Sequence, residues 1–256
     1  MRIQKRQLAV VLAVLCSLIM ISCGNRYKEK PFGGLNGRVQ KVTIYHMMPE
    51  VWYANFIGTD VMYVNTAIYD VYGNEICSAV MDSAERVQVE TESLYEDGVC
   101  TRSSQKSGIR TIASINLISK DGSTLVYNKE QNGRMTRMTV KESSFLRKHK
   151  SVVTEDGVVT TISEIKTDRK GYPVKITITE PGKGIRTVET NKFDAHHNVI
   201  EKHVITHKDS NGKDEETITY TEYGDLDDHG NWKDCRTYNE FRIPLEVLVR
   251  EFEYWE

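Results

Sequence analysis

The stretch Pro173-Val174-Lys175-Ile176-Thr177-Ile178-Thr179 decides the fold class of this chain. Apolar and polar residues alternate along it, which is the pattern of a β-strand with one buried face. Lys170-Gly171 precedes the stretch and Lys183-Gly184 follows it. Glycine beside a polar residue is typical of turns. The stretch therefore predicts a strand joined to its neighbours by short turns.

The same arrangement repeats through the second half of the chain. Turn signals recur at Asp156-Gly157, Lys170-Gly171, Lys183-Gly184, His197-Asn198, Asn211-Gly212 and His229-Gly230. The stretches between them, at 158–165, 173–179, 185–193, 199–207 and 217–223, are rich in residues that favour strands. Short turns between strands of similar length can join only antiparallel neighbours. This half of the chain predicts a β-meander.

The first half follows the same pattern less regularly. We expect strands at 39–45 and 61–69, and turns at Tyr72-Gly73-Asn74, Asp97-Gly98, Ser107-Gly108, Asp121-Gly122 and Asn132-Gly133. Residues 82–95 give a hint of a helix, although Val87, Val89 and Thr91 also suit a strand. The total is about 12 to 15 strands, and sheets of that size curl, split or close. The predicted fold is all-β: an antiparallel meander forming a strongly twisted or curled sheet, a half-barrel or a closed barrel.

The charges argue against a barrel that spans a membrane. Such a barrel needs an apolar outward face on every strand. Stretches such as Ile200-Glu201-Lys202-His203-Val204 carry too many charges for that role.

Residues 1–22 have the composition of a bacterial export signal. Arg2, Lys5 and Arg6 precede an apolar run from Leu8 to Ile21. That run is shorter than the roughly 20 residues of a membrane-spanning helix. The segment Met20-Ile21-Ser22-Cys23 resembles a lipobox, which implies that Cys23 is lipidated and becomes the new N-terminus. An ordinary cleaved signal, with Cys23 a plain thiol, is the alternative.

Lipidation would anchor the protein to a membrane of the cell envelope, expected to be the outer membrane. Residues 23–34 read as the lipidated cysteine and a linker, and residues 35–256 as a single β-domain. The segment Gly24-Asn25-Arg26-Tyr27-Lys28 lacks the acidic cluster that resembles a surface-export tag in such bacteria. We therefore expect the periplasmic face.

The charge balance argues against nucleic acid as a partner. The signal contains three of the 34 basic residues and none of the 36 acidic ones, so the processed chain has a formal charge of −5. Its charges of both signs are interspersed, whereas nucleic-acid binding requires a clustered basic face.

Three of the turns share a motif. Ile68-Tyr69-Asp70-Val71-Tyr72-Gly73-Asn74, Phe193-Asp194-Ala195-His196-His197-Asn198 and Asp227-Asp228-His229-Gly230-Asn231-Trp232 place an aspartate shortly before glycine or asparagine. They resemble the YD (RHS-type) repeat. With the opening Leu35-Asn36-Gly37-Arg38-Val39, the chain is similar to small YD-repeat-like lipoproteins of Bacteroidetes-type bacteria. The resemblance implies a fold and is nearly silent on activity. Physically, Asp70 can accept hydrogen bonds from its own turn and Gly73 can supply a positive φ.

No pattern in the chain points to catalysis, a metal or a cofactor. There is no Gly-x-Ser-x-Gly or Ser-x-x-Lys motif. Asp225, Asp227 and Asp228 match a calcium loop poorly, because Arg236 stands where the bidentate glutamate belongs. The histidines at 196, 197, 203 and 207 cannot chelate one ion from one extended strand. Cys77, Cys100 and Cys235 are interpreted as buried thiols, with a Cys77–Cys100 disulfide as the alternative. We expect a protein that is not an enzyme.

Binding is the better functional hypothesis. Aromatic residues cluster without alternation at Trp52-Tyr53-Ala54-Asn55-Phe56, beside Pro49. Trp52, Tyr53 and Phe56 are the predicted contacts for a glycan or an envelope protein partner. The expected function is a non-catalytic binding or scaffolding module of the envelope. The alternatives are a purely structural envelope protein and a hydrolase whose site the sequence does not reveal.

Overall fold

The computed structural model describes residues 35–52, 55–208 and 214–256, and for residues 50–59 it describes the backbone alone. These parts of the chain are almost entirely β-structure. Their one helical segment is a 3-10 turn at Pro181–Lys183, and they contain no helix of the length and apolarity needed to cross a membrane. The strands are β1 (Val39–Trp52), β2 (Asn55–Tyr69), β3 (Glu75–Asp82), β4 (Val87–Glu96), β5 (Val99–Ser107), β6 (Arg110–Asp121), β7 (Thr124–Gln131), β8 (Arg134–Phe145), β9 (Lys148–Glu155), β10 (Val158–Thr167), β11 (Pro173–Glu180), β12 (Ile185–Phe193), β13 (Val199–Lys208), β14 (Glu215–Tyr223), β15 (Asp234–Asn239) and β16 (Pro244–Tyr254).

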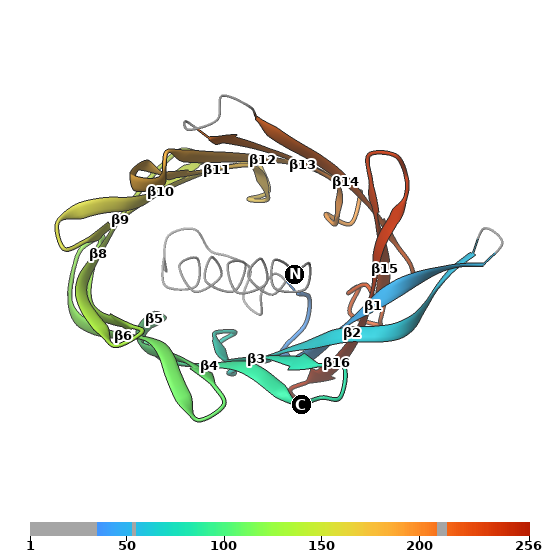
Figure 1. Cartoon of the computed structure of the whole chain (residues 1–256), viewed down its shortest axis with the longest axis horizontal. Helices are drawn as coiled ribbons and strands as arrows, with labels where there is room; N and C mark the ends of the chain where they lie inside the picture. Colours follow the sequence, from blue (N-terminus) through green and yellow to red (C-terminus); the bar gives the residue numbers. More distant parts are fainter. Residues whose placement is uncertain (1–34, 53–54, 209–213) are drawn as a thin grey trace.

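All of these strands belong to one closed barrel (Figure 1). Each strand pairs with the next along the chain in antiparallel fashion, and β16 pairs with β1 to complete the ring. The all-β antiparallel meander predicted from the sequence is confirmed. Among the predicted alternatives of twisted sheet, half-barrel and closed barrel, the structure selects the closed barrel.

The described residues contain sixteen strands, slightly more than the sequence predicted. The difference comes from turns that lack glycine. Glu85, Leu146 and Arg242 take the positive φ that the sequence argument looked for only at glycine and asparagine. The hint of a helix at residues 82–95 is wrong, because this segment is a turn followed by β4. The predicted turn at Asn211-Gly212 lies outside the described residues.

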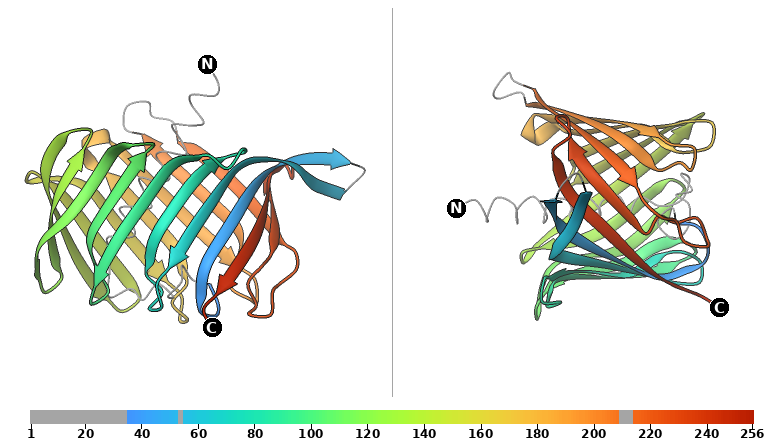
Figure 2. Two further views of the ribbon diagram at one scale, coloured as in Figure 1. Left: turned by 90° about the horizontal axis from the view of Figure 1, so that it is seen from below. Right: turned by 90° about the vertical axis from the view of Figure 1, so that its right-hand side faces the viewer.

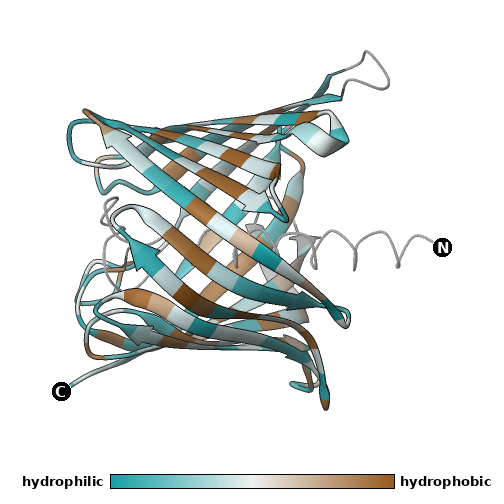
Figure 3. Ribbon diagram, turned by 90° about the vertical axis from the view of Figure 1, so that its left-hand side faces the viewer, coloured by the Kyte–Doolittle hydropathy of each residue, from teal (hydrophilic) through white to brown (hydrophobic). Residues whose placement is uncertain are grey.

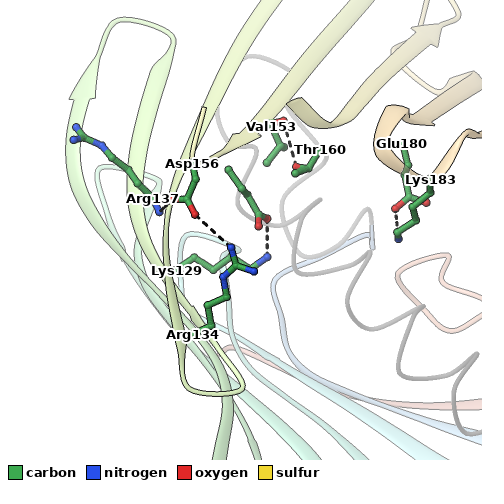
Figure 4. Close-up of polar contacts among 9 residues, drawn as sticks. Lys129, Arg134, Arg137, Val153, Asp156, Thr160, Glu180 and Lys183 are labelled. Atoms are coloured by element: carbon green, nitrogen blue, oxygen red, sulfur yellow. Dashed lines mark hydrogen bonds and ion pairs between the residues drawn. The ribbon is translucent and has the colours of Figure 1, made fainter. Parts of the chain in front are cut away.

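Successive side chains point to opposite faces of the wall. Figure 4 shows Lys129 reaching toward the interior of the barrel and Arg137 pointing away from it. Lys129 therefore identifies the inward face of β7, which it shares with the buried Leu125 and Tyr127. Figure 3 shows the resulting alternation of hydrophilic and hydrophobic residues along the strands.

Buried side chains form separate patches rather than one central core. One cluster spans β5 to β9, with Tyr127 and Val140 fully buried. Another lies where β1 meets β2 and β16, around Val39 and Val42. Barrels of 16 strands are too wide for side chains to fill and leave an open channel. The wall is thus packed in patches around a wide interior.

The hairpin of β1 and β2 is longer than the others. Figure 2 shows it projecting past the rim of the barrel as an arm. The pairing of β1 with β2 shifts register after His46 and again after Met48, and such bulges bend a strand pair. The arm ends at the Trp52–Asn55 pair.

Candidate functional site

The outward face of the barrel is rich in charge. Register and alternation place an acidic or basic side chain on the outward face of most described strands. Several of these charges pair directly across neighbouring strands: Lys150 with Glu164 at 3.0 Å, and Lys41 with Glu253 at 2.8 Å. Such pairs are stable in water and costly in lipid.

The inward face has a different composition. Along the middle of the wall it carries aliphatic side chains interspersed with hydroxyls and amides: Ala67, Ser78, Val80, Thr91, Ser93, Ser103, Ile115, Met138, Val140, Ser151, Val153, Ser163, Ile165, Ile176, Ile178, Thr187, Val204, Thr217 and Leu248. On β11, for example, Ile176 and Ile178 face inward and are half-buried, whereas Lys175 faces outward and is exposed. The inner wall is therefore amphipathic and carries little net charge.

A recess of about 440 Å³ opens at the rim formed by the β7–β8 and β9–β10 turns. Lys129 and Glu155 lie in it 2.7 Å apart, and Arg134 reaches to within 3.9 Å of Asp156 (Figure 4). Gln131, Thr136 and Thr160 add uncharged polar groups. Because its cations already contact carboxylates, the recess suits a neutral polar ligand better than a charged one.

A polar cluster lies on the inner wall at the base of the arm. Nδ1 of His46 lies 2.6 Å from Oε1 of Glu246, and Nδ2 of Asn65 lies 3.0 Å from Nε2 of His46. Tyr63 stacks on the imidazole at 3.9 Å, and burial together with the charge of Glu246 raises the pKa of Tyr63 to about 12. Both ring nitrogens have partners, so His46 has no free nitrogen to act as a base. The cluster holds β16, β1 and β2 together where the arm bends away.

A third polar feature is Arg250, on the inward face of β16. Its guanidinium lies 3.4 Å from the ring centroid of Trp232, in the β14–β15 loop. Burial lowers the pKa of Arg250 to about 10, so it stays protonated at neutral pH. Its Nε is buried and has no hydrogen-bond partner among the described residues.

The structure bears on the predicted site residues to different degrees. Cys23 and Tyr53 lie outside the described residues. Trp52 and Phe56 lie at the end of the arm, in the facing ends of β1 and β2, and the structure describes their backbone alone. Their role as ligand contacts stays a prediction. Cys77, Cys100 and Cys235 are free thiols, so the Cys77–Cys100 disulfide alternative is wrong.

The histidine group is divided among different partners. His203 contacts Glu216 and His207 contacts Asp214, each at 2.7 Å, and His197 stacks on Tyr172. Within the described ranges no group of three or more His, Cys, Asp or Glu side chains could hold a metal ion.

No local sequence pattern predicts the inner wall, the His46 cluster or Arg250 as a site. His46, Asn65 and Glu246 are up to 200 residues apart in the chain and meet only when β16 pairs with β1. Alternation within single strands did signal two faces, but it cannot tell which one faces the interior.

Two solved structures align with this chain along the course of the backbone. A porin-like protein from Bacteroides uniformis ATCC 8492 aligns with a TM-score of 0.49 and 11% identity, over 85% of this chain and 99% of its own. A porin-like protein from Bacteroides vulgatus ATCC 8482 aligns with a TM-score of 0.37 and 11% identity, over 85% of this chain and 98% of its own. No family model and no curated protein matches this chain. Neither similarity assigns a function to this chain, which is therefore inferred from its own residues.

Proposed function

We propose that this protein is a non-catalytic binding module of the cell envelope, anchored through lipid on Cys23, whose barrel stands in water and binds uncharged or weakly charged amphipathic molecules along its inner wall. The observation that carries the proposal is the partition of charge between the two faces. Exposed ion pairs such as Lys150–Glu164 and Lys41–Glu253 lie on the outside. Aliphatic and hydroxyl side chains line the middle of the inner wall, where charged side chains such as Lys202 and Glu189 contact one another. That arrangement is the reverse of a barrel that faces lipid.

Binding inside the barrel is tested with neighbouring residues of β11. All described strands lie between Val39 and Tyr254, so a chain from residue 24 onward contains the whole barrel. This chain is titrated with N-phenyl-1-naphthylamine, an uncharged apolar dye that becomes fluorescent out of water. Ile176→Asn, on the inward face, is expected to weaken dye binding because it places an amide among aliphatic groups. Thr177→Asn, on the outward face, is the matched control. Equal weakening by both variants, or no dye binding by the wild type, would refute the proposal.

The anchor is tested separately. Cys23→Ala should move the protein from the membrane pellet to a form that high salt or alkaline wash extracts, because the acyl chains that hold it are lost. Cys77→Ala should leave it in the pellet. Protease added to intact cells should leave the barrel uncut if it faces the periplasm, and digestion would place it on the cell surface instead.

A second candidate function concerns the arm. Because β1 and β2 project past the rim, their ends are placed to contact a glycan or a partner protein (Figure 2). A glycan array and crosslinking in native membranes, each with Trp52→Ala as the control, test this contact. If neither a glycan nor a partner depends on Trp52, the arm has no binding role.

A further inference from the structure

Arg250 is a cation that the barrel leaves without a counter-charge. It lies on the inward face of β16 between Leu248 and Phe252, directly opposite Ile44 of β1. Among the described residues, no side chain or carbonyl accepts a hydrogen bond from its guanidinium, and no carboxylate forms an ion pair with it. Arg250 is half-buried, with its Nε fully buried, and a charge that is even partly desolvated without a partner costs free energy.

Three other cations of the inner wall show what is missing at Arg250. Lys129 lies 2.7 Å from Glu155, Lys202 lies 3.5 Å from Glu189, and Lys208 contacts Glu215 at 2.5 Å. Lys202 and Lys208 are neutralised by an acid on a neighbouring strand, and Lys129 by an acid two strands away. Arg250 instead has neutral neighbours: Trp232 stacks on it, and Cys235, Tyr223 and Tyr69 lie near it.

The surroundings hold the guanidinium in a defined place. Trp232 is buried and packs at 5.4 Å against Tyr223, so it forms a fixed platform for one face of the guanidinium. A guanidinium held in this way presents its N–H groups in a fork that matches the two oxygens of a carboxylate or phosphate. Trp232 and Phe252, with the aliphatic wall beside them, suit an apolar chain attached to that anion.

We propose that Arg250 binds the anionic group, a carboxylate or a phosphate, of an amphipathic ligand whose apolar part lies along the inner wall. This inference rests on the proposed function and adds the chemical class of one end of the ligand. The bound anion supplies the counter-charge that the described residues do not.

Calorimetry with matched ligands tests this role on the chain from residue 24 onward. Decanoate and decyl phosphate carry the two candidate anions, decanol carries the same chain without charge, and inorganic phosphate carries charge without the chain. We expect the wild type to bind decanoate or decyl phosphate more tightly than decanol. Arg250→Met should weaken binding of the anionic ligand roughly 30-fold or more and leave decanol unchanged. Lys202→Met, which alters an already paired cation, should change all affinities little.

The variant is expected to fold, because methionine fills the volume of the arginine stem without a charge to desolvate. Its melting temperature should equal or exceed that of the wild type. Preference for decanoate over decyl phosphate identifies a carboxylate site, and the reverse identifies a phosphate site. Competition by inorganic phosphate would show that the anion binds without the chain.

Three outcomes distinguish failure of the Arg250 inference from failure of the proposed function. If decanol and the apolar dye bind but the anionic ligands bind wild type and Arg250→Met equally, Arg250 is not an anion site. If decanol and the dye do not bind while the anions still bind through Arg250, the inner wall is not the apolar site. If no anion binds the wild type, the Arg250 inference is wrong.

Discussion

One five-residue turn recurs at both rims of the barrel, and its geometry is set by two residues. The first side chain accepts hydrogen bonds from the backbone amides two and four residues later, as Asp70 does from Tyr72 and Asn74. The same bonds start at Asp82, Asp168, Asp194, Asp227 and Asn239. The fourth residue has a positive φ, such as 87° at Gly73 and 81° at Gly230. The sequence argument for Asp70 and Gly73 is confirmed.

Glu85 occupies the positive-φ position of one such turn, with φ 59°. A side chain in this region costs about 1 kcal/mol, which glycine avoids at some cost in chain entropy. We expect Glu85→Gly to raise the free energy of unfolding by about 0.5 kcal/mol, measured by urea denaturation. Glu85→Ala retains the strain and serves as the control. A loss of stability in the glycine variant would contradict this account of the turn.

Asp168 gives its turn a dependence on acid. Burial alone would raise the pKa of Asp168, but hydrogen bonds from the backbone amides of Tyr172, Lys170 and Gly171 outweigh it and lower the pKa. Because the pKa of Asp168 is lower in the folded state than in the unfolded state, its ionised carboxylate stabilises the fold at pH values above the unfolded pKa of about 3.9. This stabilisation is lost as the pH falls through the folded-state pKa. Asp168→Asn keeps the acceptor, as Asn239 shows naturally, and cannot titrate. Asp168→Asn should therefore be less stable than wild type at pH 7 and lose less stability between pH 5 and pH 2, so that the two proteins become equally stable in acid. If the free energies of unfolding of the two proteins fell in parallel as the pH decreased, Asp168 would not be the source of the acid dependence.

At the scale of the element, closure of the barrel depends on one loop. Asn231 of the β14–β15 loop is buried, and its side chain binds both backbone groups of Asn36 and the hydroxyl of Tyr254. Tyr254 also donates to Asp227. These contacts tie the segment before β1 to the end of β16, so they reinforce the seam where the first and last strands meet.

Asn231→Ala should therefore destabilise the barrel more than the same change at an equivalent turn position. It leaves the amide and carbonyl of Asn36 without their partners, at a cost of about 2 kcal/mol or more. Asn198 has the same position in the β12–β13 turn, and its side chain bonds only Asp194 of its own turn. We expect Asn198→Ala to cost about 1 kcal/mol. Urea denaturation measures both, and hydrogen exchange at β1 and β16 should accelerate in Asn231→Ala alone. Equal effects would show that the seam does not depend on Asn231.

At the scale of the whole molecule, the ring of strands makes stability a shared property. Each strand has two neighbours, and opening the ring at any point exposes two edges. Unfolding is therefore expected to expose distant parts of the wall together rather than strand by strand.

The reactivity of the thiols of Cys100 on β5 and Cys235 on β15 tests whether these two parts of the wall unfold together. Burial raises the pKa of Cys100 to about 11 and that of Cys235 to about 12, so both should resist a thiol reagent in the folded protein. Cys77 is only half-buried and should react first. In increasing urea, Cys100 and Cys235 should become reactive over the same concentration range, measured by mass spectrometry of the labelled sites. If one thiol became reactive at a clearly lower urea concentration than the other, the barrel would open in parts.

Local sequence patterns are sufficient to predict the fold class and the order of the strands. Alternation and short turns are local properties, and equal strands joined by tight turns leave only an antiparallel meander. Turns at Glu85, Leu146 and Arg242 escaped prediction because their backbone strain is held by surrounding hydrogen bonds rather than signalled by glycine. Cys23, Trp52, Tyr53 and Phe56 remain predictions that derive from sequence alone.

Closure of the sheet, and which of its two faces lies inside, depend on contacts that form in the folded barrel. Closure depends on β1 meeting β16, a pairing between segments about 200 residues apart that no local pattern encodes. Once the ring closes, alternation acquires a direction: Ile176 faces the interior and Lys175 the outside of the barrel. The same closure brings Arg250 beside Trp232 without an acid, because strand register, and not the spacing of residues in the chain, sets which charges meet.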